Sequence, residues 1–259
     1  MAARPHPDFL KFLGTAGARF VVASQLRASG GLWLELAGQR IMIDPGPGAL
    51  VRALSSRPKL DPAHLDAVVI THRHLDHAND VNCILEAVTA GGHSRRGLLL
   101  GPPDLYEAGS ILCPYVLDYV ADYQCTTEGG SFALGPLVVR TPVRHDHPGD
   151  TFGLVIEAEG RRIGLLVDTR YFEGLAAHYA SCDLLVVHCV LLENPDRRVY
   201  HLSLDDAALL IAAAQPRQAI LTHFGMNMLR AKPWVLAERL SAELGLPVAA
   251  ARDGQTVAL

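Results

Sequence analysis

Ala67-Val-Val-Ile-Thr-His-Arg-His-Leu-Asp-His-Ala78 is the stretch that decides the fold, because an apolar strand runs here into a polar turn and then into a helix. His72 and His74 are two residues apart, so in an extended chain both side chains project to the same side and can chelate one metal ion. Asp76 and His77 follow as the backbone enters the helix and can face a second ion beside the first. Imidazole and carboxylate ligands without cysteine suit Zn, Mn or Fe rather than a structural cysteine-zinc site.

Strands and helices are expected in two blocks around this segment. The first block contains strands and then helices, with strands at 9–14, 32–37, 40–43 and 67–70 and helices at 78–89, 102–109 and 114–121. The second block does the same, with strands at 131–134, 137–142, 152–157, 162–168, 183–188, 219–222 and near 248 and helices at 204–214 and 233–244. Two such blocks predict an α/β protein in which two mixed β-sheets pack face to face with helices on the outer faces, an αββα sandwich. We expect one domain over residues 1–259.

The composition excludes several classes of protein. With 49% hydrophobic residues the chain is not of the disordered or low-complexity kind, and its net charge of −4 gives no basic field that would attract nucleic acid. Five cysteines without a Cys-x-x-Cys pair indicate small core residues in a reduced compartment rather than a disulfide framework. We find no apolar stretch near the ~18 residues of a membrane helix and no secretion signal, so a soluble, cytoplasmic protein is expected.

The segment from Thr71 to His77 resembles the signature of the metallo-β-lactamase superfamily, and similar segments follow in the order of that family's pattern. They are Val143–Gly153, Gly164–Thr169 and Leu221–Gly225. The resemblance extends over essentially the whole chain and implies the metallo-β-lactamase fold. It also implies two divalent metal ions, with zinc as the first expectation and manganese or iron as alternatives.

Seven metal-binding side chains are implied by this resemblance: His72, His74, Asp76, His77, His147, Asp168 and His223. Asp168 would bridge the two ions, His147 would complete the first site and His223 the second. His145 competes with His147 for the same role, and the six-residue offset from His147 to Gly153 favours His147.

Other residues are given supporting or undecided roles. Asp44 resembles the family's aspartate that supports the first ligands without binding metal. His188 ends a buried strand and has no place in the family pattern, so a hydrogen-bonded position in the core or near the site is expected. Surface or loop positions are expected for four histidines, His6, His64, His93 and His178. Arg95 and Arg96 are candidates for contacting a phosphate. Tyr115, Tyr119 and Tyr123 are spaced by four residues, which predicts that they share one helix face.

Charge arithmetic connects the expected metals to a reaction. Two divalent ions, two aspartates and a bridging hydroxide leave a net charge of about +1, which favours a small anionic substrate such as a phosphodiester. Asp76 and His201 are the candidate catalytic residues. His201 resembles the histidine that assists phosphate binding or leaving-group protonation in the family's tRNA-processing nucleases and small phosphodiesterases.

The choice of substrate rests on resemblance to one branch of the superfamily. Phe12-Leu-Gly-Thr15, Asp150-Thr-Phe-Gly153 and His201 resemble the branch of RNase Z and the phosphoribosyl cyclic phosphodiesterase, although the cysteine-rich zinc site of the latter is missing. We expect a dinuclear metal-dependent hydrolase that cleaves a small cyclic phosphate or cyclic nucleotide with a metal-bridging hydroxide. Alternatives are a carboxylic ester, thioester or lactone hydrolase, then a tRNA-processing endonuclease or a non-catalytic metal-binding module. Neither a stable nucleic acid partner nor a membrane is expected, and a homodimer is left open.

Overall fold

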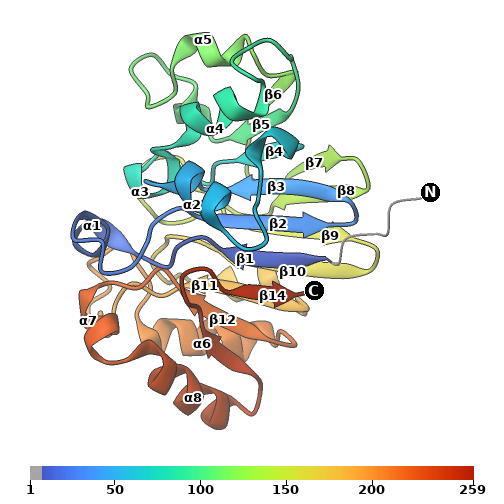
Figure 1. Ribbon diagram of the computed structural model, residues 1–259. Coiled ribbons are helices and arrows are strands. Elements are labelled where there is room, and N and C mark those ends of the chain that lie inside the picture. The colour runs from blue at the N-terminus through green and yellow to red at the C-terminus, as the bar shows by residue number, and fades with distance from the viewer. Residues whose placement is uncertain (1–7) are drawn as a thin grey trace.

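Two seven-stranded β-sheets lie face to face in the computed structural model, which describes residues 8–259 (Figure 1). In spatial order the first sheet contains β14 (Thr256–Ala258), β1 (Phe9–Phe12), β2 (Leu32–Leu36), β3 (Gln39–Ile43), β4 (Ala67–Val69), β5 (Leu98–Gly101) and β6 (Asp122–Cys125). The second contains β13 (Val248–Ala250), β12 (Ala219–Thr222), β11 (Leu184–His188), β10 (Arg161–Leu166), β9 (Leu154–Ala158), β8 (Leu137–Thr141) and β7 (Gly130–Leu134). Strands β3 to β6 and β10 to β13 pair in parallel and the others antiparallel, so both sheets are mixed.

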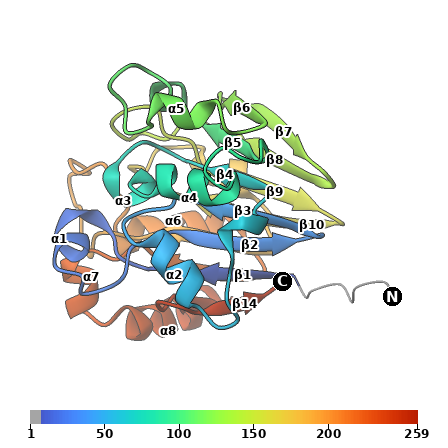
Figure 2. The ribbon, with the colours of Figure 1, turned by 45° about the horizontal axis from the view of Figure 1, so that its top comes forward.

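Helices cover the outer face of each sheet. The α-helices are α1 (Ala18–Ala23), α2 (Ala49–Ser55), α3 (Leu75–Ala78), α4 (Val81–Val88), α5 (Pro114–Leu117), α6 (Leu204–Ala214), α7 (Met226–Arg230) and α8 (Pro233–Leu244). Short 3₁₀ turns are η1 (Pro62–His64), η2 (Pro103–Leu105) and η3 (Leu175–Tyr179). Helices α2, α4 and α5 pack on the first sheet, and α6 and α8 pack on the second (Figure 2). The expected αββα sandwich is therefore confirmed, and no helix among residues 8–259 is long and apolar enough to cross a membrane.

Alternation along the strands explains the four layers. In β2, Leu32 and Leu34 face the core between the two sheets, while Trp33 faces the core under α2 and α4. In β11, Leu184 and Val186 face the same inter-sheet core, while the intervening residues face α6 and α8. Both faces of these strands are thus buried against apolar neighbours, which explains their nearly continuous hydrophobic sequences.

Several elements differ from the sequence predictions. The helix expected at 78–89 is divided into α3 and α4, because the amide of Asp80 donates to the carbonyl of Pro45 (2.9 Å) instead of continuing the helix. The helix expected at 102–109 is only the 3₁₀ turn η2. Strand β6 was not expected: its sequence Asp-Tyr-Gln-Cys is only four residues long and is mostly exposed at the edge of the sheet.

The tyrosine and cysteine predictions are each wrong in part. Helix α5 ends at Leu117 and Tyr123 lies in β6, so the three tyrosines do not share one helix face. Cys182 and Cys189 are buried as expected, whereas Cys83 and Cys125 are exposed. Exposed thiols on an outer helix and an edge strand do not contribute to the core.

A substitution between the sheets tests this layer assignment. Leu34→Ala should destabilise the protein by about 2–5 kcal/mol, because the side chain is fully buried and the surrounding sheets cannot close the cavity. Leu209→Ala on α6, where the leucine is 52% exposed, should change the free energy of unfolding by less than about 0.5 kcal/mol. Urea unfolding of both variants measures this, and equal losses would contradict the layer assignment.

Candidate metal centre

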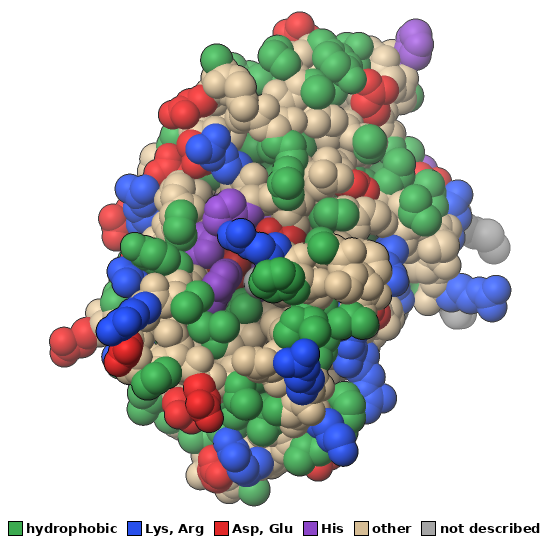
Figure 3. All heavy atoms as spheres, turned by 90° about the vertical axis from the view of Figure 1, so that its left-hand side faces the viewer, with side chains coloured by type: hydrophobic (Ala, Val, Ile, Leu, Met, Phe, Trp, Pro, Cys, Tyr) green, Lys and Arg blue, Asp and Glu red, His purple; other side chains and the backbone are tan. Residues whose placement is uncertain are grey.

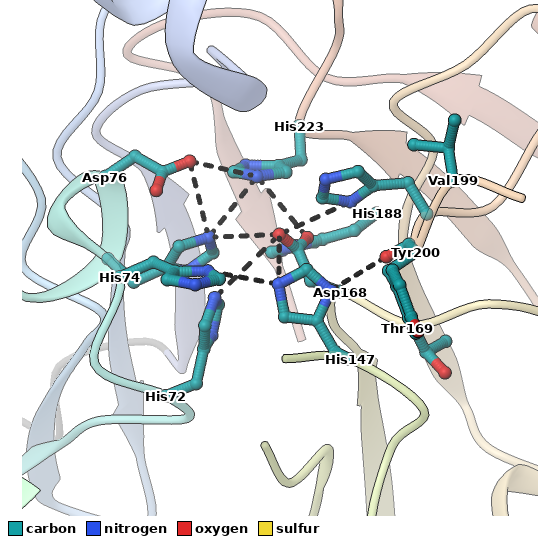
Figure 4. Close-up of polar contacts among 12 residues, drawn as sticks. His72, His74, Asp76, His147, Asp168, Thr169, His188, Val199, Tyr200 and His223 are labelled. Atoms are coloured by element: carbon teal, nitrogen blue, oxygen red, sulfur yellow. Dashed lines mark hydrogen bonds and ion pairs between the residues drawn. The ribbon is translucent and has the colours of Figure 1, made fainter. Parts of the chain in front are cut away.

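The candidate site lies at the carboxyl ends of four parallel strands. His72 follows β4, Asp168 follows β10, His188 ends β11 and His223 follows β12 (Figure 4). Because parallel strands present their carboxyl ends at one edge of a sheet, segments far apart in sequence meet there. In this fold the edges of both sheets come together, so the site receives side chains from each.

The first group consists of His72, His74 and His147, with ligand atoms that all lie within 4.8 Å of one another. His147 Nδ1–H donates to the carbonyl of Tyr200 (2.8 Å), which leaves a lone pair on Nε2, 3.1 Å from His74 Nδ1. Buried His72 Nε2 has no hydrogen-bond partner within residues 8–259. An unpartnered buried imidazole nitrogen beside two others fits a divalent cation, because the cation would satisfy all three.

The second group consists of His77, His223 and two aspartates. His77 Nε2 lies 3.3 Å from His223 Nε2, and Asp76 Oδ2 lies 3.7 Å and 3.5 Å from these two nitrogens. Asp168 Oδ2 is 3.5 Å from His77 Nε2, and Asp168 Oδ1 is 3.4 Å from His223 Nε2. These four side chains could hold a second cation.

Asp168 lies between the two groups. Its Oδ2 is also 3.9 Å from both His72 Nε2 and His147 Nε2, so one carboxylate faces the nitrogens of both groups. His201 Nδ1 lies 3.5 Å from the same oxygen. The structure thus brings together all seven predicted metal-binding side chains and His201.

His188 contacts this centre, although the sequence pattern gave it no role. Its Nδ1–H donates to Asp168 Oδ1 (2.9 Å), and its ring stacks on that of His223 with centroids 4.4 Å apart. The sequence feature that could have indicated this contact is the position of His188 at the end of β11, between the strands that lead to Asp168 and His223. His188 therefore helps to orient the carboxylate that both groups share.

Asp44 orients one histidine of each group. The amide and the hydroxyl of Thr71 both donate to Asp44 (2.7 Å each), and Thr71 Oγ1 accepts from His72 Nδ1 (3.2 Å). Asp44 Oδ2 also accepts directly from His77 Nδ1 (2.9 Å). With Nδ1 engaged in both rings, Nε2 of each histidine faces the centre.

Burial and mutual charge shift the pKa values in the site. Burial lowers the pKa of His147 to about 4, which favours the neutral imidazole that binds a metal. Burial alone would raise the pKa of Asp168, but the imidazoles of His223 and His201 outweigh it and hold that pKa well below its usual range. Burial opposes charge on His77 as well, yet Asp76 and Asp44 raise its pKa well above the ordinary value. The directions for His147 and Asp168 favour a neutral imidazole beside an ionised carboxylate, the forms of these groups that bind a divalent cation.

Two glycines permit close contacts that support the site. A Cβ atom at Gly46 would collide with the carbonyl oxygen of Asp76, and a Cβ atom at Gly17 would collide with the carbonyl oxygen of His223. His223 itself has a positive φ of 60°, a conformation that is strained for a non-glycine residue. Tight packing of the backbone therefore holds both side chains in place.

Other candidates lie away from the centre. Buried His145 makes a hydrogen bond through Nε2 with the hydroxyl of Tyr179 (2.7 Å), so His147 and not His145 is in the cluster. Arg95 Nε donates to the carbonyl of Val120, and Arg96 donates to loop carbonyls, which gives both a structural position rather than a phosphate contact. Three further histidines, His64, His93 and His178, join no metal-capable group among the described residues, and His6 lies outside them.

A cavity of about 800 Å³ opens above the cluster. Five site residues line it: His74, Asp76, His147, Asp168 and His201. Its other walls are apolar or basic: Leu75, Pro148, Val199, Tyr200, Arg19 and Arg198. Figure 3 shows histidine side chains in a hollow of this face, with hydrophobic and basic side chains around it.

Residues 39–224 match the family model of the beta-lactamase superfamily domain, and the chain belongs to this family. It has the metallo-β-lactamase fold and lies near the RNase Z branch. It is 30% identical to the uncharacterized protein MJ1374 of Methanocaldococcus jannaschii, over 96% of this chain and 94% of the relative. It is 25% identical to a ribonuclease Z of Bradyrhizobium diazoefficiens, over 83% and 88% of the two chains. The metallo-beta-lactamase fold protein YhfI of Bacillus subtilis has a similar structure, with a TM-score of 0.80 at 17% identity and coverage of 97% and 99%.

Asp44→Asn tests the orienting role of Asp44. An amide has one acceptor oxygen and presents an NH₂ group to existing donors, so Thr71 and His77 cannot both keep their hydrogen bonds. We expect zinc to bind about 10- to 100-fold more weakly, as measured by competition with a chelator. Asp66→Asn, at the opposite end of β4, is the matched control and should leave zinc affinity unchanged. Unchanged affinity in Asp44→Asn would contradict the role.

Proposed function

We propose that the protein is a dinuclear metal-dependent hydrolase that cleaves a small phosphodiester of the cyclic phosphate or cyclic nucleotide type. The observation that carries the proposal is the position of Asp168, whose carboxylate faces two groups of histidine nitrogens at the floor of an open cavity. A coarser conclusion, a metal-dependent hydrolase of the β-lactamase superfamily, already follows from the family.

Each group of side chains has its own part in this proposal. His72, His74 and His147 would hold one ion, and Asp76, His77 and His223 the other, with Asp168 between them. Two divalent ions, with zinc preferred over manganese or iron, would supply a water of lowered pKa and stabilise negative charge on phosphoryl oxygens.

His201 would act on the substrate from the wall of the cavity. It follows the exposed segment after β11, and its side chain is 18% exposed while its Nδ1 lies 3.5 Å from Asp168 Oδ2. Because His201 lines the cavity, a ring N–H of this histidine can donate to a phosphoryl oxygen or to the leaving oxygen of a bound diester. Asp76, on the other wall, lies next to the cavity and to the second histidine group.

The cavity supports a small anionic substrate. About 800 Å³ is in the range of small-molecule pockets, and Arg19 and Arg198 add positive charge to its walls. Several relatives are ribonuclease Z proteins, whose name denotes cleavage of a phosphodiester. The net charge of −4 favours a small diester over RNA.

Substrate profiling tests the proposed chemistry. Zinc- or manganese-loaded protein should hydrolyse bis-p-nitrophenyl phosphate or a cyclic nucleotide, and a chelator should abolish the activity. The same preparation is assayed against a thioester, a lactone and a tRNA precursor. Turnover of a carboxylic ester, thioester or lactone without any diester turnover would overturn the proposal in favour of that chemistry, and turnover of the tRNA precursor alone would overturn the small substrate.

His201→Ala tests the role of that histidine. Loss of a positioned proton donor should lower diester turnover by about 10²- to 10⁴-fold, while two metal ions per chain remain by elemental analysis. His64→Ala, an exposed histidine on η1, is the control and should leave turnover unchanged. A His201→Ala protein that has lost its metal ions would show that His201 holds metal instead.

A further inference from the structure

Two loops beside the metal centre interlock through a reciprocal pair of arginine and tyrosine side chains. The Arg170 guanidinium carbon lies 4.2 Å from the ring centroid of Tyr200, and that of Arg197 lies 4.0 Å from the ring centroid of Tyr171. Each loop therefore supplies one arginine and one tyrosine. We call these four residues the arginine–tyrosine clasp.

Each arginine of the clasp is itself held by a carboxylate. Arg170 Nε and Nη2 donate to Asp146 Oδ2 (2.9 and 2.8 Å), and Asp146 directly precedes His147. Arg197 Nε donates to Asp206 Oδ1 (2.9 Å), and Asp206 belongs to the capping box that starts α6. Guanidinium groups suit these positions because their planar faces stack on aromatic rings while their edges donate to carboxylates.

The clasp joins the three loops that carry the central side chains of the site. Arg170 is two residues after Asp168, and its backbone amide donates to the carbonyl of Asp146 (2.9 Å) in the loop of His147. Tyr200 precedes His201, and its carbonyl oxygen accepts from His147 Nδ1 (2.8 Å). The contact between Tyr200 and the His147 ring is drawn in Figure 4. The position of Tyr200 therefore affects the orientation of the His147 ring and, through the adjacent backbone, the placement of His201.

The hydrogen bonds within the segment 193–200 are mostly its own: Asn194 Nδ2 donates to the carbonyls of Val199 (3.0 Å) and His201 (3.2 Å), and the amide of Arg197 donates to the carbonyl of Asn194 (2.9 Å). The clasp arginines connect this segment to the neighbouring loops, and Arg170 Nη1 also donates to the carbonyl of Arg197 (3.4 Å).

Residues 195–200 are all exposed, so apolar burial contributes little there. Arg197 has a positive φ of 48°, which a non-glycine residue adopts only where its surroundings impose it. The ion pair to Asp206 and the ring of Tyr171 supply such surroundings.

We infer that the clasp is a positioning device, in which Arg170 and Arg197 fix the segment 193–203 so that Tyr200 orients His147 and His201 lies over Asp168. Arg170 and Arg197 touch neither the cluster nor the cavity above it, and they act only through these neighbours. The inference about turnover rests on the proposed function, whereas the inference about the segment does not.

Hydrogen–deuterium exchange tests the structural part. In the zinc-loaded full chain, Arg170→Ala and Arg197→Ala should each raise deuterium uptake in 193–203 relative to the wild type. Tyr171→Leu should also raise deuterium uptake in 193–203, although it keeps the ion pair of Arg197 with Asp206. This variant tests the inference even if an arginine variant folds poorly. Arg239→Ala, which breaks the half-exposed pair with Glu243 on α8, is the matched control. Unchanged uptake in 193–203 in every clasp variant would overturn the inference.

Steady-state kinetics on the diester test the link to His201. Arg197→Ala should lower kcat by about 10- to 100-fold and leave KM within about twofold, because a small displacement of a reacting group costs turnover more than binding. In a His201→Ala background the same change should cost clearly less, since one of the two groups that the clasp positions is absent and only the effect through Tyr200 on His147 remains. Arg170→Lys should keep part of the wild-type kcat, because lysine retains the charge but not the planar stacking.

Two outcomes separate this inference from the proposed function. An equal loss of kcat from Arg197→Ala in both backgrounds would show that the clasp does not act through His201 and would overturn the positioning role assigned to it there. A wild-type protein without activity on any diester would overturn the proposed function, while the deuterium uptake would still decide whether the clasp holds the segment.

Discussion

The convergence of imidazole lone pairs on one buried carboxylate is the constraint on which the site depends. His147 Nε2 lies 3.1 Å from His74 Nδ1 and His77 Nε2 lies 3.3 Å from His223 Nε2, both pairs beside Asp168, an arrangement of buried polar atoms that a bound cation would stabilise. The fold maintains this arrangement through Asp44, His188 and the carbonyl of Tyr200, each of which fixes a ring or a carboxylate from behind. The side chains that would bind metal therefore lower the stability of the metal-free fold at the carboxyl ends of the strands.

Much of the fold could be predicted from sequence because its signals are local. Helix α6 has the predicted bounds, since a serine cap, two aspartates in the first turn and an apolar stripe all lie within one short stretch. The segment from His72 to His77 is equally local, and its spacing alone indicates two adjacent groups of ligands. Strand β6 was missed because four mostly exposed residues at a sheet edge give too short a pattern, and the break at Asp80 was missed because its hydrogen bond to Pro45 joins distant residues.

The site was predicted less completely, because several of its contacts join residues that are distant in sequence. The structure places His147 in the first group of histidines, whereas His145 makes a hydrogen bond with Tyr179 outside it. The contact of His188 with Asp168 and the stacking of Arg170 on Tyr200 join residues 20 and 30 positions apart and have no motif of their own. Such contacts depend on how loops fold back over a sheet edge, which sequence spacing does not specify.

The division of ligands between the two sheets has a mechanical consequence. In the first group His72 and His74 follow β4 of one sheet, whereas His147 precedes β9 of the other, and in the second group His77 and His223 are divided in the same way. A cation held by either group would therefore cross-link the two sheets at the edge of their shared core. If the two sheets moved relative to each other, the ligands of both groups would separate together. The relative position of the sheets and the geometry of the metal centre are therefore coupled.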